Sequence, residues 1–133
     1  MTLPSGDVLI TGGGLSNDVY MFNPKKFTIR RKTSMKKIRK EHSTVMVNGK
    51  VYALGGYDGE QARFLAECEV YDVTKDEWSV ISPMNKAKCA FAATAVNNDL
   101  IFSCGGYDGE NRLRNIEQYI INEDKWETLD ILL

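Results

Sequence analysis

The amino-acid sequence predicts an all-β protein made of repeated units, and three observations support this prediction. The hexapeptide GGYDGE at residues 55–60 recurs unchanged at residues 105–110, a shift of 50. Each copy is followed by a tyrosine and, seven residues later, by a tryptophan: Tyr71 with Trp78, and Tyr119 with Trp126. No segment shows a sustained helical period of apolar residues. A tandem repeat without helices indicates a series of similar β-sheets.

The middle unit contains four predicted strands. Residues 42–47 form the first, and Asn48-Gly49 supplies the two positive-φ positions of a tight hairpin turn. Residues 51–54 are a short apolar run, predicted to be a buried strand that ends at the glycine pair 55–56. Residues 67–72 form the third strand and residues 77–81 the outer fourth strand.

The last unit repeats this order at residues 91–96, 100–104, 115–121 and 125–129, with a first hairpin turn that is one residue longer. A fainter copy lies upstream, where Gly12-Gly13 is followed by Tyr20 and then Phe27. We therefore divide the chain into a partial blade at 1–34 (strands two to four) and complete blades at 35–83 and 84–133. A period of about 50 residues is typical of propeller blades.

The repeated landmarks have structural explanations. Paired glycines let neighbouring strands approach closely and adopt backbone conformations closed to other residues. A tryptophan on the outer strand can pack on the next blade while its N–H binds a backbone carbonyl. The residues predicted to be scaffold are Gly12, Gly13, Gly55, Gly56, Gly105, Gly106, Tyr71, Trp78, Tyr119 and Trp126.

Together these residues resemble the kelch repeat. The resemblance is carried by Gly-Gly-Tyr-Asp-Gly, the downstream tyrosine, the tryptophan seven residues later, and Pro83-Met84 before a basic residue. The first unit departs from the pattern, because Phe27 stands where tryptophan is expected and its glycine pair precedes the next by 43 residues. The resemblance implies four-stranded kelch-type β-propeller blades, here an incomplete ring of about three.

The resemblance also implies that loops on one rim bind a protein partner. These are the loops between second and third strands and those leading into each first strand. The candidate binding residues are Tyr57, Arg63, Tyr107, Arg112, Arg114, Asn115, Lys40 and Cys89. Tyrosine and arginine dominate interaction hot spots. The alternatives are that the tyrosines pack the loop and that the arginines are solvated charges.

Charge is segregated along the chain. Residues 25–40 hold nine basic residues and no acid, whereas the whole chain has 17 basic and 18 acidic residues, so the rest holds 8 against 18, or −10. The basic stripe consists of Lys25, Lys26, Arg30, Arg31, Lys32, Lys36, Lys37, Arg39 and Lys40. It favours an acidic partner, and binding should weaken with salt. Nucleic acid is less favoured, because Phe27 alone offers a stacking ring there. The alternative is a solvated outer strand.

Catalysis, metals and cofactors are not expected. Catalytic propellers of the galactose-oxidase type use two histidines, and His42 is the one histidine of this chain. Cys68, Cys89, Cys104 and His42 lack the spacing of a zinc site. A Cys89–His42 dyad is conceivable, but nothing in the sequence orients the imidazole. The alternatives are a fragment of a catalytic propeller whose active site lies in other blades, and a substrate receptor of a cullin-type ubiquitin ligase.

The length of 133 residues is short for a propeller, since a six-bladed ring needs roughly 300. About 2.75 repeats would leave apolar sheet faces open. We therefore expect either part of a longer propeller or a chain completed by another subunit. Ligase receptors of this kind usually pair the propeller with an N-terminal BTB domain, for which 133 residues leave no room. A complete chain would therefore disfavour that role, whereas a piece of a longer protein leaves it open. Three cysteines that cannot all pair, and no apolar run of eighteen residues, favour a cytoplasmic setting, with a cytoskeletal or ciliary role open.

Overall fold

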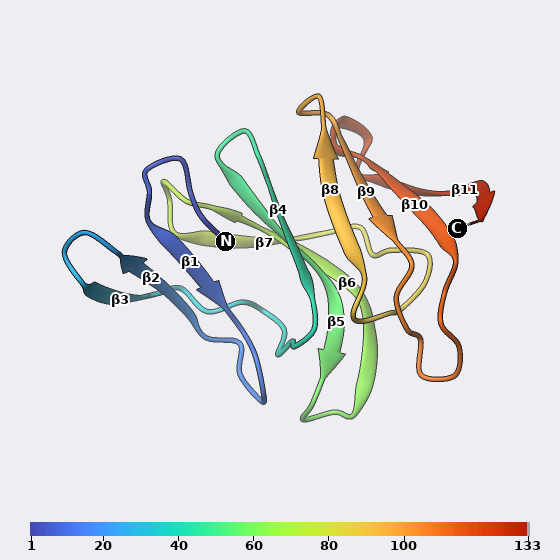
Figure 1. The fold of residues 1–133 in the computed structure, drawn as a ribbon, viewed down its shortest axis with the longest axis horizontal. Coiled ribbons are helices and arrows are strands. Elements are labelled where there is room, and N and C mark those ends of the chain that lie inside the picture. The colour runs from blue at the N-terminus through green and yellow to red at the C-terminus, as the bar shows by residue number, and fades with distance from the viewer. Residues whose placement is uncertain (133) are drawn as a thin grey trace.

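The computed structural model describes residues 1–132, which form three antiparallel sheets and one 3-10 turn (Figure 1). The first sheet contains β1 (Val8–Thr11), β2 (Val19–Asn23) and β3 (Thr28–Lys32). The second contains β4 (Ser43–Val47), β5 (Lys50–Asp58), β6 (Arg63–Asp72) and β7 (Glu77–Ile81). The third contains β8 (Ala92–Val96), β9 (Leu100–Cys104), β10 (Asn115–Ile120) and β11 (Lys125–Leu132), with η1 (Ile121–Glu123) before its last strand.

Each sheet is a simple meander in which strands follow one another in chain order. The sheets stand side by side like blades, so the predicted all-β propeller architecture is confirmed (Figure 1). Strands β4 and β8, the first of their sheets, contact each other on the inner side. β3, β7 and β11 are the outer strands.

Two hydrophobic cores hold the blades together. One lies between the first and second sheets and includes Leu9, Val19, Met21, Met35 and Tyr71. The other joins the second and third sheets with residues such as Val45, Tyr52, Leu54, Ile101 and Trp126. Each core mixes side chains of two sheets, because one face of an isolated sheet leaves its apolar residues in water.

The tryptophans pack toward the preceding blade, not the next one as the sequence suggested. Trp78 donates its indole N–H to Thr33 O at 2.8 Å, and Trp126 donates to Ser82 O at 2.9 Å. Tyr71 and Tyr119 stack beside them at 4.8 and 4.9 Å between ring centroids. The outer strand of each later blade is thus tied to the connection that precedes the blade.

The middle glycine pair does not end its strand, which corrects the prediction. β5 continues through Gly55 and Gly56 to Asp58, and β6 begins at Arg63, four residues earlier than expected. The ladder shifts register between Leu54 and Gly56 while both glycines have positive φ, which marks a bulge. In the third sheet β9 does end at Cys104, as predicted.

The landmarks assigned to the first blade are also corrected. Phe27 has φ of 53°, matching Asp76 (54°) in the equivalent turn of the second blade. Phe22 pairs with Ile29, as Tyr71 pairs with Trp78. The tyrosine and tryptophan positions are therefore held by Phe22 and Ile29, two residues beyond Tyr20 and Phe27. Upstream, Thr2 forms a single bridge with Val8.

Candidate partner-binding rim

The loops between second and third strands of all three blades lie along one rim, at the lower edge of Figure 1. The connections 33–42 and 82–91 reach the same rim before entering β4 and β8. This rim is the one that the sequence predicted to bind a partner.

Two pairs of predicted residues meet here through their backbones. Lys40 and Tyr57 exchange N–H···O bonds of 3.0 and 2.9 Å, and Cys89 and Tyr107 do the same at 3.0 and 2.9 Å. The approach is close enough to require glycine, because a Cβ on Gly56 would lie 2.6 Å from Lys40 O. Each glycine-pair loop is therefore clamped to the connection that enters its own blade.

An aromatic cluster joins two of the loops. The ring of Phe64 lies 5.0 Å from that of Tyr57 and 5.7 Å from that of Tyr107, in edge-on geometry. Tyr107 is 37% exposed, and its hydroxyl donates to Gly109 O at 2.7 Å. On the other side, Lys40 Nζ lies 5.5 Å from the centre of the Tyr57 ring. We call Tyr57, Phe64 and Tyr107 the rim aromatic cluster.

Sequence reasoning missed Phe64. It faces Tyr57 across the β5–β6 ladder, and Arg112 takes the corresponding place opposite Tyr107. A single aromatic residue inside an otherwise polar loop was the available signal. Its side chain also contacts the loop of the next blade, since a Cβ on Gly109 would lie 2.8 Å from the Phe64 ring.

The turn residues after each tyrosine behave alike. Asp58 accepts hydrogen bonds from the N–H groups of Glu60 and Gln61, and Asp108 from those of Glu110 and Asn111, as expected of Asp-Gly turns. These backbone donors, with the nearby Lys86 ammonium, lower the pKa of Asp108 to about 2. An open hollow lined by Lys86, Ala87, Asp108 and Glu110 lies beside this turn.

A sequence model of the KLHDC2/KLHL20/DRC7 Kelch-repeats domain matches residues 3–132. The chain belongs to the kelch-repeat family. Among curated proteins it is 32% identical over 114 residues to "Kelch-like protein 7" of Rattus norvegicus, covering 86% of this chain and 19% of that protein. "Kelch-like protein 35" of Mus musculus is 32% identical over 122 residues, covering 90% and 21%.

An F-box/kelch-repeat protein of Arabidopsis thaliana is 34% identical over 137 residues, covering 95% of this chain and 33% of that protein. The chain thus spans about a fifth to a third of the length of these kelch proteins. The kelch resemblance drawn from the glycine pairs and tryptophans is confirmed.

Several predicted kelch rim residues are less available than expected. The Cys89 side chain is buried, and burial together with the neighbouring Glu41 carboxylate raises the pKa of its thiol to about 11. The Cys89 side chain is therefore too buried to contact a partner, and its part in the rim is limited to its backbone bonds with Tyr107. The Arg63 guanidinium donates hydrogen bonds to Glu67 Oε1 at 2.7 Å and to Gln61 Oε1 at 3.1 Å.

The three remaining candidates lie in the β9–β10 loop. Arg112 and Arg114 are exposed. Asn115 is half-buried at the start of β10, and its carbonyl accepts the Gly105 N–H at 3.1 Å. Tyr107 and the two arginines are therefore the exposed part of the predicted set in this blade.

The sequence placed Arg39 in an exposed basic stripe, and the structure corrects this. Its side chain is 0% exposed and donates to Glu69 Oε2 at 2.8 Å, Gly55 O at 2.6 Å and Glu67 O at 2.9 Å. The N–H groups of Lys36 and Lys37 also bind the Glu69 carboxylate. Lys88 and Glu117 form the equivalent buried pair at 3.2 Å in the third blade.

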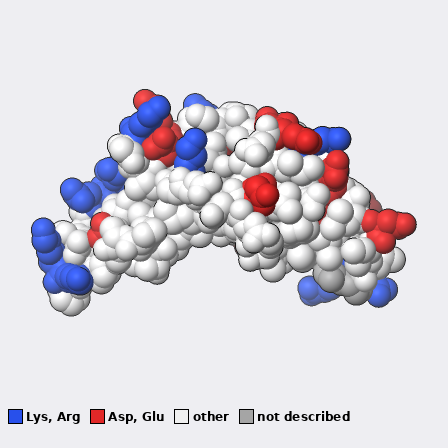
Figure 2. All heavy atoms as spheres, turned by 90° about the horizontal axis from the view of Figure 1, so that it is seen from above, with Lys and Arg blue, Asp and Glu red and all other residues white. Residues whose placement is uncertain are grey.

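The remaining basic residues of 25–40 divide between three places, one of which is the connection between β3 and β4 with Lys36 and Lys37. Lys25, Lys26, Arg30, Arg31 and Lys32 lie on β3 and the turn before it, at the outer edge of the first blade. Lys40 lies at the rim beside Tyr57. Figure 2 shows Lys and Arg gathered over the end of the molecule formed by the first blade, and Asp and Glu more frequent toward the other end.

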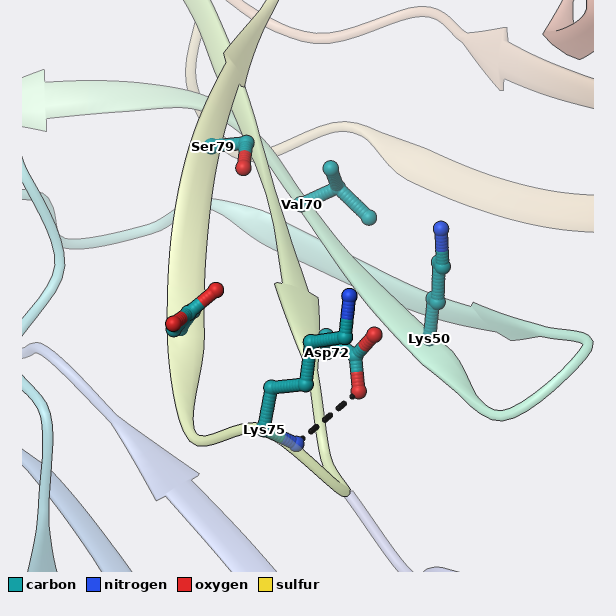
Figure 3. Close-up of a pocket in the computed structure, with 6 residues that line it drawn as sticks. Lys50, Val70, Asp72, Lys75 and Ser79 are labelled. Carbon is teal, nitrogen blue, oxygen red and sulfur yellow. Dashed lines mark hydrogen bonds between the residues drawn. The ribbon is translucent and has the colours of Figure 1, made fainter.

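A hollow of about 130 Å³ lies far from the rim, near the β6–β7 turn (Figure 3). It is lined by Lys50, Val70, Asp72, Lys75, Glu77 and Ser79. The Asp72 carboxylate accepts the N–H of Lys75 at 3.1 Å, a turn contact that explains its position. Opposite charges balance within this hollow, so it presents no selective charge to a ligand.

No group of three or more potential metal-binding side chains occurs within residues 1–132. His42 Nε2 contacts Thr11 Oγ1 at 2.8 Å, so the imidazole faces the first blade. Burial, with a smaller effect of the Arg39 charge, lowers the pKa of His42 to about 4. The three cysteines are free thiols, and no helix within the described residues is long and apolar enough to cross a membrane.

Proposed function

We propose that this chain is part of a kelch β-propeller that binds a protein partner, without catalysis, through the rim that carries Tyr57, Phe64 and Tyr107. The observation that supports the proposal most strongly is the rim aromatic cluster, which spans two blades and leaves Tyr107 37% exposed. Arg112 and Arg114 are exposed in the same loop as Tyr107. Tyrosine and arginine provide large contact areas with directional donors.

The rim is also well prepared for binding. Its tyrosine backbones are held by paired hydrogen bonds to Lys40 and Cys89, and its turns by the carboxylates of Asp58 and Asp108. A surface that is already ordered loses little conformational entropy when a partner binds. The proposed contact set is Tyr57, Phe64, Tyr107, Arg112, Arg114 and Lys40, with Arg63 and Asn115 at its margin.

The proposal includes the organisation of the ring. Blades at 1–34, 35–83 and 84–133 repeat the same connection between neighbours, in which a tryptophan binds the preceding connection. We propose that further blades, from a longer chain or another subunit, cover the outer faces of the first and third sheets. Exposed apolar residues such as Ile10 and Val96 on these sheets support this. The three free thiols favour a cytoplasmic setting.

A second candidate is a substrate receptor of a cullin-type ubiquitin ligase. The names of two relatives favour it. One is an "F-box/kelch-repeat protein" of Arabidopsis thaliana, and the other is a "Kelch repeat and BTB domain-containing protein" of Caenorhabditis elegans. In such an assembly the rim would hold the substrate. An upstream BTB or F-box segment in the full reading frame would favour this role over a plain scaffold.

The test compares rim variants with a matched surface variant. The double variant Tyr57→Ala/Tyr107→Ala should abolish capture of the partner that the unchanged chain retains, identified by mass spectrometry and then titrated in purified form. Lys36→Glu/Lys37→Glu is the control, since the ring contacts of the aromatic cluster involve neither lysine. Loss of binding in the control with full binding in the rim variant would overturn the proposal.

A further inference from the structure

The outer edge of the first blade is open along its whole length. β3 is the last strand of the sheet order β1-β2-β3 and pairs with β2 alone among the residues that the structure describes. Thr28 to Arg31 are exposed, and Lys32 is half-buried. The free edge of such a strand presents unpaired N–H and C=O groups, which can pair with a strand from another chain.

This edge differs in charge from the outer edges of the other two blades. Within residues 25–32 there are five basic residues and no acid, whereas β7 carries one acid and no base, and β11 carries one lysine against two acids. We call Lys25, Lys26, Arg30, Arg31 and Lys32 the basic edge. It lies at the end of the molecule where the positive charge gathers in Figure 2.

Intramolecular partners satisfy less than half of this charge. Arg31 forms an ion pair with Asp18, and Lys32 Nζ lies 3.9 Å from Asp76. The side chains of Lys25, Lys26 and Arg30 make no ion pair with any residue between 1 and 132. Three cations therefore remain available to an external acidic group.

The edge stays open whether or not more blades are present. An additional blade would pack on the face of the first sheet and cover residues such as Ile29, which is 60% exposed. β3 is the outermost strand, on the side away from the inner strands β4 and β8. Its free edge therefore points away from any neighbouring blade.

We propose that the basic edge binds an extended acidic segment of a protein partner, which adds to β3 as a further strand. This rests on the proposed role as a protein-interaction module, but it places a second contact outside the rim. Backbone hydrogen bonds along β3 would hold the segment, and its alternate carboxylates, which share one face of the added strand, would meet Arg30. Charge complementarity would select acidic over neutral segments.

Basic residues on an edge can also serve to prevent unwanted pairing between like strands. β7 and β11 argue against this as the whole explanation, because they are also outermost strands of their sheets and lack a comparable cluster of cations. The experiment below separates the two roles.

The probe is a fluorescent twelve-residue peptide of alternating Glu and Val, titrated by anisotropy with the full chain. The triple variant Lys25→Glu/Lys26→Glu/Arg30→Glu should weaken binding by about tenfold or more, and raising NaCl from 50 to 300 mM should weaken it about as much. The matched control is Lys50→Glu/Lys75→Glu/Lys125→Glu, which reverses three exposed lysines of the other blades and should change affinity less than about twofold. Peptide binding should also slow amide hydrogen exchange within Thr28–Lys32.

Three results would overturn the proposal. A peptide methylated at alternate backbone nitrogens cannot pair with β3, so equal binding would mean charge attraction without an added strand. Tighter binding to phosphatidylserine vesicles or to a short RNA duplex would assign the edge to another class of ligand. Dimerisation of Lys25→Gln/Lys26→Gln/Arg30→Gln with unchanged peptide affinity would assign the charges to edge protection. The rim variant Tyr57→Ala/Tyr107→Ala should retain peptide binding, so failure of the rim proposal would leave this result unaffected.

Discussion

The second and third blades contain the same hexapeptide, yet the chain continues from it in two ways. In the second blade the β5–β6 ladder runs through the hexapeptide, with Tyr57 opposite Phe64 and Asp58 opposite Arg63. In the third, β9 ends at Cys104, and across the loop Tyr107 and Arg112 form an isolated bridge in place of a continuous ladder. Counted from the glycine pair to the buried glutamate (Glu69 or Glu117), the second blade has two more residues than the third. Its loop also places Phe64 between Tyr57 and Tyr107. Residues outside the hexapeptide therefore decide whether it lies in a strand or in a loop.

The two blades also contain one buried ion pair each, with different cations. Arg39 donates three hydrogen bonds, and Glu69 accepts from Lys36, Lys37 and Arg39. Lys88 reaches Ser103 Oγ at 3.0 Å and lies 3.2 Å from Glu117, which otherwise accepts from Asn85 N–H. The planar guanidinium spreads its donors over several acceptors, whereas an ammonium is a compact charge. The second blade is thus the more extensively bonded of the two.

The largest expected effect comes from breaking these pairs. Glu69→Ala should lower the free energy of unfolding by about 3–5 kcal/mol, because it leaves Arg39 buried without a counter-charge. Glu117→Ala should cost less, since fewer donors lose an acceptor. Urea denaturation of the chain measures both, with the exposed Glu77→Ala as control. An equal or larger loss for Glu117→Ala would contradict the ranking of the two blades.

The next effect depends on pH and belongs to the second blade alone. His42 and Phe91 occupy equivalent places in their blades. A Cβ on Gly56 would lie 2.9 Å from the Cβ of His42, and a Cβ on Gly106 would lie 2.9 Å from the Cβ of Phe91. The pKa of His42 falls from 6.5 to about 4 on folding. Below pH 6.5 the unfolded chain therefore binds a proton that the folded chain does not. Stability should fall by about 3 kcal/mol as pH is lowered from 6.5 to 4.

Urea denaturation at several pH values tests this directly. His42→Phe copies the third blade and should remove the loss between pH 6.5 and 4. The carboxylates with lowered pKa, such as Asp108 and Asp124, release their stabilisation only below the ordinary carboxyl range. An unchanged slope in His42→Phe would mean that another group is responsible.

Alanine at the second glycine of each pair should have a smaller effect. Gly56→Ala and Gly106→Ala both force a side chain onto a residue with φ above 100°, and the new Cβ would lie 2.6 Å from Lys40 O or 2.9 Å from Cys89 O. Each should destabilise by about 1–3 kcal/mol, with Gly56→Ala the worse. Gly49→Ala, with positive φ and open space, is the control in thermal unfolding.

The smallest expected effect is on the rim loops. Phe64→Arg copies Arg112 and removes two edge-on ring contacts, which are worth about 0.5–1.5 kcal/mol each beyond the buried area. The β5–β6 hairpin should open more often, so amides of residues 57–63 should exchange faster while those of β4 do not. Unchanged exchange would show that the two extra residues, and not Phe64, extend the ladder.

Local patterns in the sequence predicted most of the fold. The Asn48-Gly49 turn has φ of 51° and 74°, as a tight hairpin requires, and the tryptophan N–H groups bind backbone carbonyls as expected. The alignment of the first blade failed, because counting seven residues from Tyr20 led to Phe27, which is 83% exposed in a turn. Strand pairing, which sets the true equivalence of Ile29 and Trp78, is not visible in residue spacing.

The candidate rim was only partly predictable. Tyr57 and Tyr107 were found because their hexapeptides repeat. Phe64 was not, because its importance lies in two rings contributed by different blades. The burial of Cys89 was likewise invisible, since its neighbours in sequence are ordinary connection residues.

By itself the sequence determined the repeat, the order of strands and the turns, because these depend on residues close together in the chain. Only the tertiary structure decided which charges are internal. Arg39 stands among surface lysines in the sequence, and its counter-charge Glu69 lies 30 residues away. A buried cation needs a partner and carbonyl acceptors brought from distant segments, and packing of one blade on the next supplies them. What remains of the basic run is an open outer edge at β3, Lys36 and Lys37 in the connection to β4, and Lys40 at the rim.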